Sequence, residues 1–414
     1  MDRLPPEIIS NIVGHVEDQD DQALTPLSLV CHRWQPIVEA KIYRRLRLYY
    51  ASRKRPSSKP RRNPSYELLA SILTPTRLSY IRQLHVTFSR RRRQSFPVSD
   101  IIIEQLFDLL TRVPHNQEPL LHVYVGFYNF FGDFFECTPP GGLPELPMVR
   151  SFQIFSFATQ KALSPCALLY MASKMPRLRH LDVVILDLES IDQRVELARS
   201  LTDLPASIHS FFLHFFPDNN SEGLLVTENG EDILTRELRR FSQREGLREF
   251  LFNGYAELSI FWPPDSATSE LRHWPTLESF QIQFHHPQHL ASLYATESPD
   301  VAQDVNDSDT ESSDDAQDAN DSDRTDVHEE IMSDSFRALA KCSACMPKAE
   351  ENYVYFGDIW HTRFAYCTMF PEDPCVTVTG KLDFELDEET LDEWRKTAEV
   401  HNLNFQMCVE EWTE

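Results

Sequence analysis

The chain has 414 residues, is 41% hydrophobic and 11% aromatic, and contains only 11 glycines beside 27 phenylalanines. This composition excludes collagen-like and wholly disordered proteins, and so few glycines count against folds built on glycine-rich phosphate loops. The formal net charge of −24 disfavours nucleic acid as the main partner, although the charge is unevenly distributed along the chain.

No apolar run reaches the length of a membrane-spanning helix, and the first residues lack the basic and then apolar layout of a signal peptide. The eight cysteines are spread through the whole chain rather than spaced as a disulfide framework. We therefore expect a soluble protein with reduced thiols in the cytoplasm, the nucleus or both, without contact to a membrane.

The first 48 residues predict three short helices followed by a strand. Residues 5–16 begin with two prolines, and the apolar positions from Ile8 to Val16 share one helical face. A second apolar stripe covers residues 24–34, and Pro36 opens a third helix. Alternating arginine and leucine at 45–48 then indicate a strand. So short a segment cannot bury this much apolar surface by itself, so we expect an exposed patch that another chain covers.

These residues resemble the F-box, a helical module of cullin-based ubiquitin ligases. The resemblance rests on the string from Leu4 to Ile9, on Leu27, and on the Val-Cys-His-Arg-Trp run that ends at Trp34. The sequence departs from the family in an acidic first loop, residues 17–22. The resemblance implies a non-catalytic subunit that binds a Skp-type adaptor and, through this adaptor, a cullin. The residues that would form or support the adaptor face are Leu4, Pro5, Ile8, Leu27, Val30, Cys31 and Trp34. The alternative is that the helices only cap the next domain, which would make the protein a non-ligase interaction scaffold.

A basic segment follows at residues 49–64, with arginines and lysines among prolines and serines. We expect a flexible loop. It could serve as a nuclear-import signal, contact phosphates, or meet an acidic segment of its own chain.

Residues 65–414 contain a repeat of a turn followed by alternating apolar positions. The anchors Phe152, Leu181, Phe211, Phe250 and Phe280 are 29, 30, 39 and 30 residues apart. Helical patterns at 163–174, 189–201 and 231–241 lie between them. The arrangement resembles the degenerate leucine-rich repeats of fungal F-box proteins, which implies an α/β solenoid with parallel strands. A closed doubly wound α/β domain stays open as the alternative.

Residues 297–330 contain fourteen acids and one arginine. Such a segment repels itself and has little apolar surface to bury, so we expect a disordered insert between the last anchor strand and a helix at about 329–345. Ser308 and Ser312 precede acids by three positions, as in sites of acidophilic kinases. An acidic helix near 388–400, with Trp394 as a core anchor, is expected to close the end of the repeat array.

No nucleophile elbow, phosphate loop, HExxH or kinase motif is present, so we expect no enzyme and no cofactor. Cys342 and Cys345 form the only Cys-x-x-Cys pair, and their distance from His361, Cys367 and Cys375 matches no compact zinc module. A histidine cluster at 285–289 reads as a loop rather than a metal site. An unknown protein target would instead contact polar residues that alternate with the buried ones on the strands: Arg82, His85, Gln153, Asp182, Gln281 and Gln283.

Overall fold

The computed structural model describes residues 4–19, 24–29, 32–51, 71–89, 100–114, 121–128, 142–156, 164–186, 191–216, 227–228, 231–263, 273–284, 318–356, 362–369, 375–380 and 386–411. The chain divides into two compact units. Unit 1 comprises residues 1–186 and 203–208, and unit 2 comprises residues 187–202 and 209–414.

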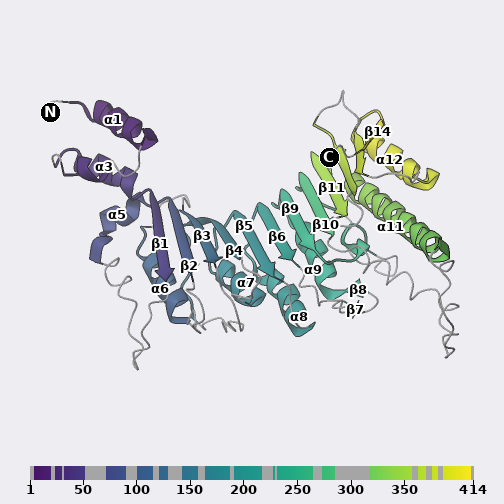
Figure 1. Ribbon diagram of the computed structural model, residues 1–414, viewed down its shortest axis with the longest axis horizontal. Coiled ribbons are helices and arrows are strands. Elements are labelled where there is room, and N and C mark those ends of the chain that lie inside the picture. The colour runs from purple at the N-terminus through teal and green to yellow at the C-terminus, as the bar shows by residue number, and fades with distance from the viewer. Residues whose placement is uncertain are drawn as a thin grey trace. The chain divides into compact units, whose positions relative to one another are not determined.

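Unit 1 begins with helices and continues as a parallel sheet with helices between its strands. Its elements are α1 (Pro6–Gln19), α2 (Leu24–Leu27), α3 (Gln35–Ile42), β1 (Arg45–Ala51), α5 (Pro75–Tyr80), β2 (Gln83–Ser89), α6 (Asp100–Thr111), β3 (Leu121–Tyr128), β4 (Val149–Ser156), α7 (Pro165–Ser173) and β5 (His180–Leu186). The strands lie side by side in chain order, and each pair is parallel (Figure 1).

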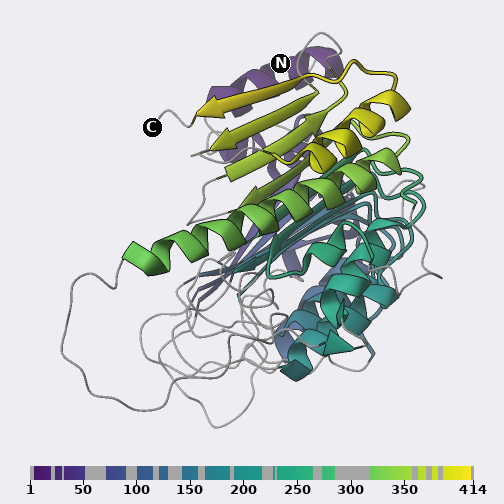
Figure 2. The same ribbon diagram turned by 90° about the vertical axis from the view of Figure 1, so that its right-hand side faces the viewer.

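Unit 2 extends the same pattern and then changes it. Its elements are α8 (Ile191–Ser200), the 3-10 turn η2 (Leu201–Asp203) that follows it, β6 (Ser210–Phe216), β7 (Thr227–Glu228), β8 (Glu231–Asp232), α9 (Ile233–Ser242), β9 (Glu249–Gly254), η3 (Leu258–Ile260), β10 (Ser279–Phe284), α11 (Asp318–Ala344), β11 (Glu351–Phe356), β12 (Thr362–Cys367), β13 (Val376–Gly380), α12 (Glu388–Val400) and β14 (Met407–Glu411). The strand order is β6, β9, β10, β11, β12, β13, β14. In Figure 2 the long helix α11 and helix α12 run beside each other along the last strands.

The predicted repeat alignment is confirmed inside each unit by the strand register. Phe152 pairs with Leu181 in unit 1, and Phe211, Phe250 and Phe280 form one row across three strands of unit 2. All five side chains are at most 1% exposed. The long 39-residue step has a plain cause, because the hairpin β7–β8 is inserted between β6 and β9.

The intervening helices begin where the sequence places capping residues. The side chains of Ser164, Asp232 and Asp387 accept hydrogen bonds from backbone N–H groups three positions on, at 3.2, 2.8 and 2.7 Å. Each bond satisfies a donor that the first helical turn cannot use. This chemistry, together with the apolar periodicity, explains why α7, α9 and α12 fall close to their predicted ranges.

A buried cluster of charges joins the helices of unit 2. Arg194 of α8 donates to both carboxylate oxygens of Asp232 at 3.0 and 2.7 Å, and also to the carbonyl of Tyr255 at 2.9 Å. Close by, Arg239 binds the carboxylate of Glu231. Buried charges are tolerated only when they are paired and hydrogen-bonded in this way.

Three predictions need correction. The strands are not parallel throughout, because β12 runs antiparallel to both β11 and β13. The second helix is a single turn, α2, rather than a helix that reaches Trp34. The acidic insert is not wholly disordered, since residues 318–330 form the first half of α11. The second half of α11 carries buried apolar side chains that hold the helix in the fold. Extending a helix that is already held costs little, and acidic residues are favoured near its N-terminus.

Some predicted features lie outside the described residues. These are 52–64 of the basic loop, 297–317 of the acidic insert and the histidines at 285–289. The first three residues of the predicted loop, 49–51, form the end of β1. No helix of the described residues is both long enough and apolar enough to cross a membrane.

Candidate functional site

Helix α1 carries two apolar faces, and only one of them is buried. Ile9 and Val13 are fully buried, whereas Ile8 and Ile12 are 44% and 38% exposed. Ile8 and Ile12 are four residues apart and therefore lie one above the other on the helix surface. We call this pair the isoleucine row.

The buried face of α1 packs on the helices that follow. Ile9 and Val13 form one cluster with Leu24, Trp34 and Val38. Partly buried side chains pack against this cluster, namely Leu4, Val16, Leu27, Ile37 and Ile42. This cluster contains most of the apolar side chains of the described residues in this segment. The isoleucine row is not part of the cluster and stays uncovered. This uncovered apolar row is the candidate interaction surface of the segment.

The predicted adaptor residues divide into exposed and supporting positions. Ile8 and Pro5 are exposed, Leu4 and Leu27 are half-buried, and Trp34 is 4% exposed within the cluster. Val30 and Cys31 lie outside the described residues. The backbone carbonyl of Pro5 accepts hydrogen bonds from the N–H groups of Ile8 and Ile9 at 3.1 and 3.2 Å, so this proline also starts the helix.

Two exposed apolar residues were missed. The apolar periodicity places Ile12 on one face with all the apolar positions from Ile8 to Val16, and it does not single out Leu29, which is 84% exposed. The four-residue step from Ile8 to Ile12 was the signal that could have identified the second row.

A charged contact joins this helical segment to α5, the helix that precedes β2. Arg77 of α5 donates to both carboxylate oxygens of Glu39 on α3, at 3.3 and 2.7 Å. Gln35 donates to the same carboxylate at 3.0 Å, and the Arg77 guanidinium lies 5.1 Å from the centre of the Tyr43 ring. The hydrogen bonds from Arg77 lower the pKa of Glu39. Helix α3 is thereby held in place on the element that precedes β2.

The strands of unit 1 supply a second candidate surface. Along each strand of unit 1, side chains alternate between the buried face of the sheet and the opposite face. On the opposite face they form two rows that run across the strands, and we call this surface the polar face of unit 1. The first row contains Arg45, Gln83, His122, Ser151 and His180, and the second contains Arg47, His85, Tyr124, Gln153 and Asp182.

Three of the predicted target-binding residues, His85, Gln153 and Asp182, therefore lie in one row. The ring of His85 stacks on Tyr124 with centroids 4.3 Å apart, and the amide of Gln153 is 3.0 Å from the ring of His180. Burial raises the pKa of Asp182 to about 6.

Arg82 lies apart from these rows. Its guanidinium donates to the carbonyls of Ser79 and Ile81 at 2.8 and 3.0 Å, at the end of α5. These bonds satisfy carbonyls that a helix end leaves open, which gives this arginine a structural role in the described contacts.

Gln281 and Gln283 lie on the corresponding face of unit 2. Gln281 donates to the hydroxyl of Ser279 at 2.9 Å, and Gln283 donates to the hydroxyl of Tyr353 at 2.9 Å. Arg363 covers the ring of Tyr353 at 4.7 Å. This face is therefore built from amides and aromatic rings already bonded to one another.

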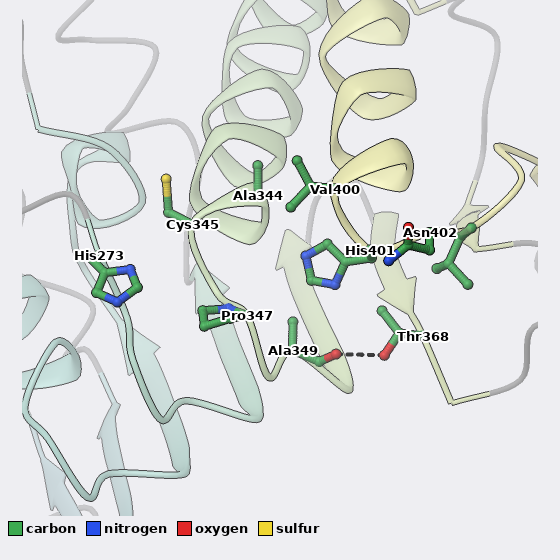
Figure 3. Close-up of a pocket in the computed structure, with 10 residues that line it drawn as sticks. His273, Ala344, Cys345, Pro347, Ala349, Thr368, Val400, His401 and Asn402 are labelled. Carbon is green, nitrogen blue, oxygen red and sulfur yellow. Dashed lines mark hydrogen bonds between the residues drawn. The ribbon is translucent and has the colours of Figure 1, made fainter.

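A hollow of about 480 Å³ lies in unit 2 between the ends of α11 and α12. Figure 3 shows His273 and Cys345 on one side of it and His401 and Asn402 on the other. The His401 ring is 3.1 Å from the carbonyl of Ser343. Within the described part of the chain, no group of three or more His, Cys, Asp or Glu could hold a metal ion. Cys342 is buried, and burial raises its pKa, which disfavours the reactive thiolate.

Comparison with known families identifies one segment of the chain. An F-box-like domain matches residues 1–49, the segment that carries the isoleucine row. F-box domains generally bind Skp-type adaptors, which indicates this kind of partner for the segment. No curated protein matches the chain.

Proposed function

We propose that the protein is the target-binding subunit of an SCF-type cullin–RING ubiquitin ligase. The isoleucine row docks on the Skp-type adaptor, and the sheets behave as a leucine-rich-repeat-like solenoid that holds a protein target. The observation that carries this proposal is the exposure of Ile8 and Ile12 in the F-box-like segment, at 44% and 38%. The protein works without an active site or cofactor, in the cytoplasm, the nucleus or both.

The mechanism is proximity. A target held by one part of the chain, while another part is docked on the ligase, presents its lysines to the conjugating enzyme at a high effective concentration. This mechanism requires that the docking segment be held firmly to the target-binding region. The contact between Glu39 and Arg77, with an N–O distance of 2.7 Å, supplies such a connection within unit 1.

Calorimetry with the purified Skp-type adaptor and the full chain tests the docking. We expect Ile8→Asp combined with Ile12→Asp to weaken binding by about tenfold or more. Full burial of an isoleucine is worth roughly 1.5–3 kcal/mol, and the adaptor would cover the part of each side chain that is still exposed, 44% and 38%. Both residues are exposed in the free protein, so the double variant keeps the buried cluster of α1. This makes it a cleaner test than Leu4→Ala, because Leu4 packs against that cluster.

The control is Val400→Asp, which also replaces an aliphatic side chain by a carboxylate, at a residue of α12 that is 58% exposed. It should bind the adaptor like the unchanged chain. Near-normal binding by the double isoleucine variant would refute the docking surface.

A further measurement separates a ligase subunit from an interaction scaffold. We expect a cullin to join the complex of the chain and the adaptor in size-exclusion chromatography. If the adaptor binds but the cullin is excluded, the scaffold interpretation replaces the ligase. If the adaptor itself does not bind, the helices act as a cap on unit 1.

A further inference from the structure

The polar face of unit 1 has an excess of positive charge. Its two rows contain two arginines, Arg45 and Arg47, and a single carboxylate, that of Asp182. A third arginine, Arg150, is exposed and lies near His122 of the first row. Burial is the main cause that lowers the pKa of His122, and the positive charge of Arg150 adds to this effect. Burial, with Arg47 and Arg45, likewise lowers the pKa of His85. Both imidazoles are therefore neutral near pH 7, and the arginines carry the charge.

These arginines take no part in the ion pairs of the described residues. Arg45, Arg47 and Arg150 are all exposed, and among the described residues none of them forms an ion pair with a carboxylate. By contrast, the guanidinium of Arg77 in the same unit donates hydrogen bonds to both carboxylate oxygens of Glu39. Guanidinium groups left unpaired on a sheet face are available to an anionic partner.

Protection of a sheet edge does not account for all of this charge. Arg45 and Arg47 lie on β1, which is the first strand of the sheet, and charged residues on such strands discourage aggregation. Arg150, however, is on β4, between two other strands. It is the extra residue of a bulge, since Leu121 pairs with Val149 and His122 pairs with Ser151. Bulges re-aim side chains and are common beside binding sites.

The spacing of the cations indicates what they bind. Arg45 and Arg47 are two residues apart on one strand, which separates them by roughly 6.6 Å. The five strands span about 19 Å at about 4.8 Å each, which is the length of about six extended residues. Cations spread in this way match several separate carboxylates better than one phosphate group, on which guanidinium groups would converge.

We propose that the polar face of unit 1 binds an extended segment rich in aspartate and glutamate in the target protein. The acidic residues lie over Arg45, Arg47 and Arg150, and neutral residues lie over Gln153 and Asp182. The aromatic pair of His85 on β2 and Tyr124 on β3 supplies a flat contact between the arginines of β1 and Arg150 on β4. This inference rests on the proposed function and names the chemistry of its target.

The test uses fluorescence anisotropy with the full chain and a labelled peptide of about ten alternating glutamate and serine residues. We expect Arg47→Glu to weaken binding about tenfold or more, and binding to weaken as salt rises from about 50 to about 300 mM. The control is Arg199→Glu, the same charge change at an exposed residue of α8 in unit 2, which should stay within about twofold. Equal losses in both variants, or no binding of the peptide, would overturn the inference.

Two further probes test the class of partner. A peptide with one phosphoserine and no other acid, and a single-stranded RNA of similar length, should both bind more weakly than the glutamate peptide. If either of these probes binds more tightly than the glutamate peptide, and if Arg47→Glu weakens that binding, then the partner belongs to the class of that probe and is not an acidic segment. Arg150→Glu, outside the F-box-like segment, should also weaken peptide binding while leaving adaptor binding in calorimetry unchanged, so failure of this inference is distinguishable from failure of the ligase assignment.

Discussion

The two units use arginine in opposite ways. In unit 2, the side chain of Arg194 is 3% exposed and bound to the fully buried carboxylate of Asp232 at 2.7 Å. In unit 1, Arg45 and Arg47 are exposed on the sheet and have no carboxylate partner among the described residues. The comparison teaches that the surroundings of an arginine separate a structural role from a binding role. A buried pair is part of the core, whereas an exposed cation keeps its charge for another molecule.

The largest effect is expected at the buried pair. Arg194→Ala leaves the carboxylate of Asp232 buried without its cation, and we expect the free energy of unfolding to fall by about 3–5 kcal/mol. Calorimetric unfolding of the full chain measures this loss. Arg199→Ala, an exposed arginine on the same helix, is the control and should change stability by less than about 0.5 kcal/mol.

The same pair gives a pH test of that assignment. Burial acts to raise the pKa of Asp232, but Arg194 and Thr235 outweigh it, and the pKa lies below its ordinary value. The stability that this carboxylate contributes is therefore present above the unfolded pKa and is lost as the pH falls through the folded one. The deficit of Arg194→Ala should accordingly shrink in acid. A deficit that stays constant down to the lowest measurable pH would contradict this account.

An intermediate effect is expected at Arg77, which is neither buried nor free. Its side chain is 26% exposed and that of Glu39 is 14% exposed. Arg77→Ala should cost about 1 kcal/mol, because solvent screens a partly exposed pair. The loss should appear as faster hydrogen exchange in α3 and α5, while amides of α9 keep their protection. Uniform acceleration in all three helices would mean that the contact is not local.

A smaller effect of opposite sign is expected at Asp182. Because burial raises its folded pKa to about 6, the folded protein binds more protons than the unfolded chain between about pH 4 and pH 6. This carboxylate therefore lowers stability as the pH rises through that range. Asp182→Asn should stabilise the protein by about 1 kcal/mol at pH 7 and by much less at pH 4. Thermal unfolding at the two pH values checks this, and equal shifts would refute it.

The smallest effect on stability is expected at the exposed arginines themselves. Arg45→Ala and Arg47→Ala should each change the free energy of unfolding by less than about 0.5 kcal/mol, since no described ion pair is lost. A loss above about 1 kcal/mol in urea unfolding would place them with Arg194 as structural residues and would weaken the case for a binding face.

Local patterns predicted much of this architecture. The spacing of Phe211, Phe250 and Phe280 identified strands that the register aligns. The acidic helix expected near 388–400 matches α12, which Asp387 caps, because capping and apolar period depend on residues close in sequence. Trp394, expected to be a core anchor, is fully buried. By contrast, the single turn of α2 depends on packing against α1 and α3, which no local pattern records. The antiparallel strand β12 forms a hairpin with β11, and the parallel repeat pattern did not include it.

The candidate sites divide in the same way. The sequence by itself determined an F-box-like segment at the start of the chain and polar residues that alternate along the later strands, because both are local patterns. Only the tertiary structure decided that Ile9 is buried while its neighbour Ile8 is exposed, since burial depends on which helices pack against α1. It also decided that His85, Gln153 and Asp182 share one row with Arg47, because strand register is set between segments about 30 to 40 residues apart.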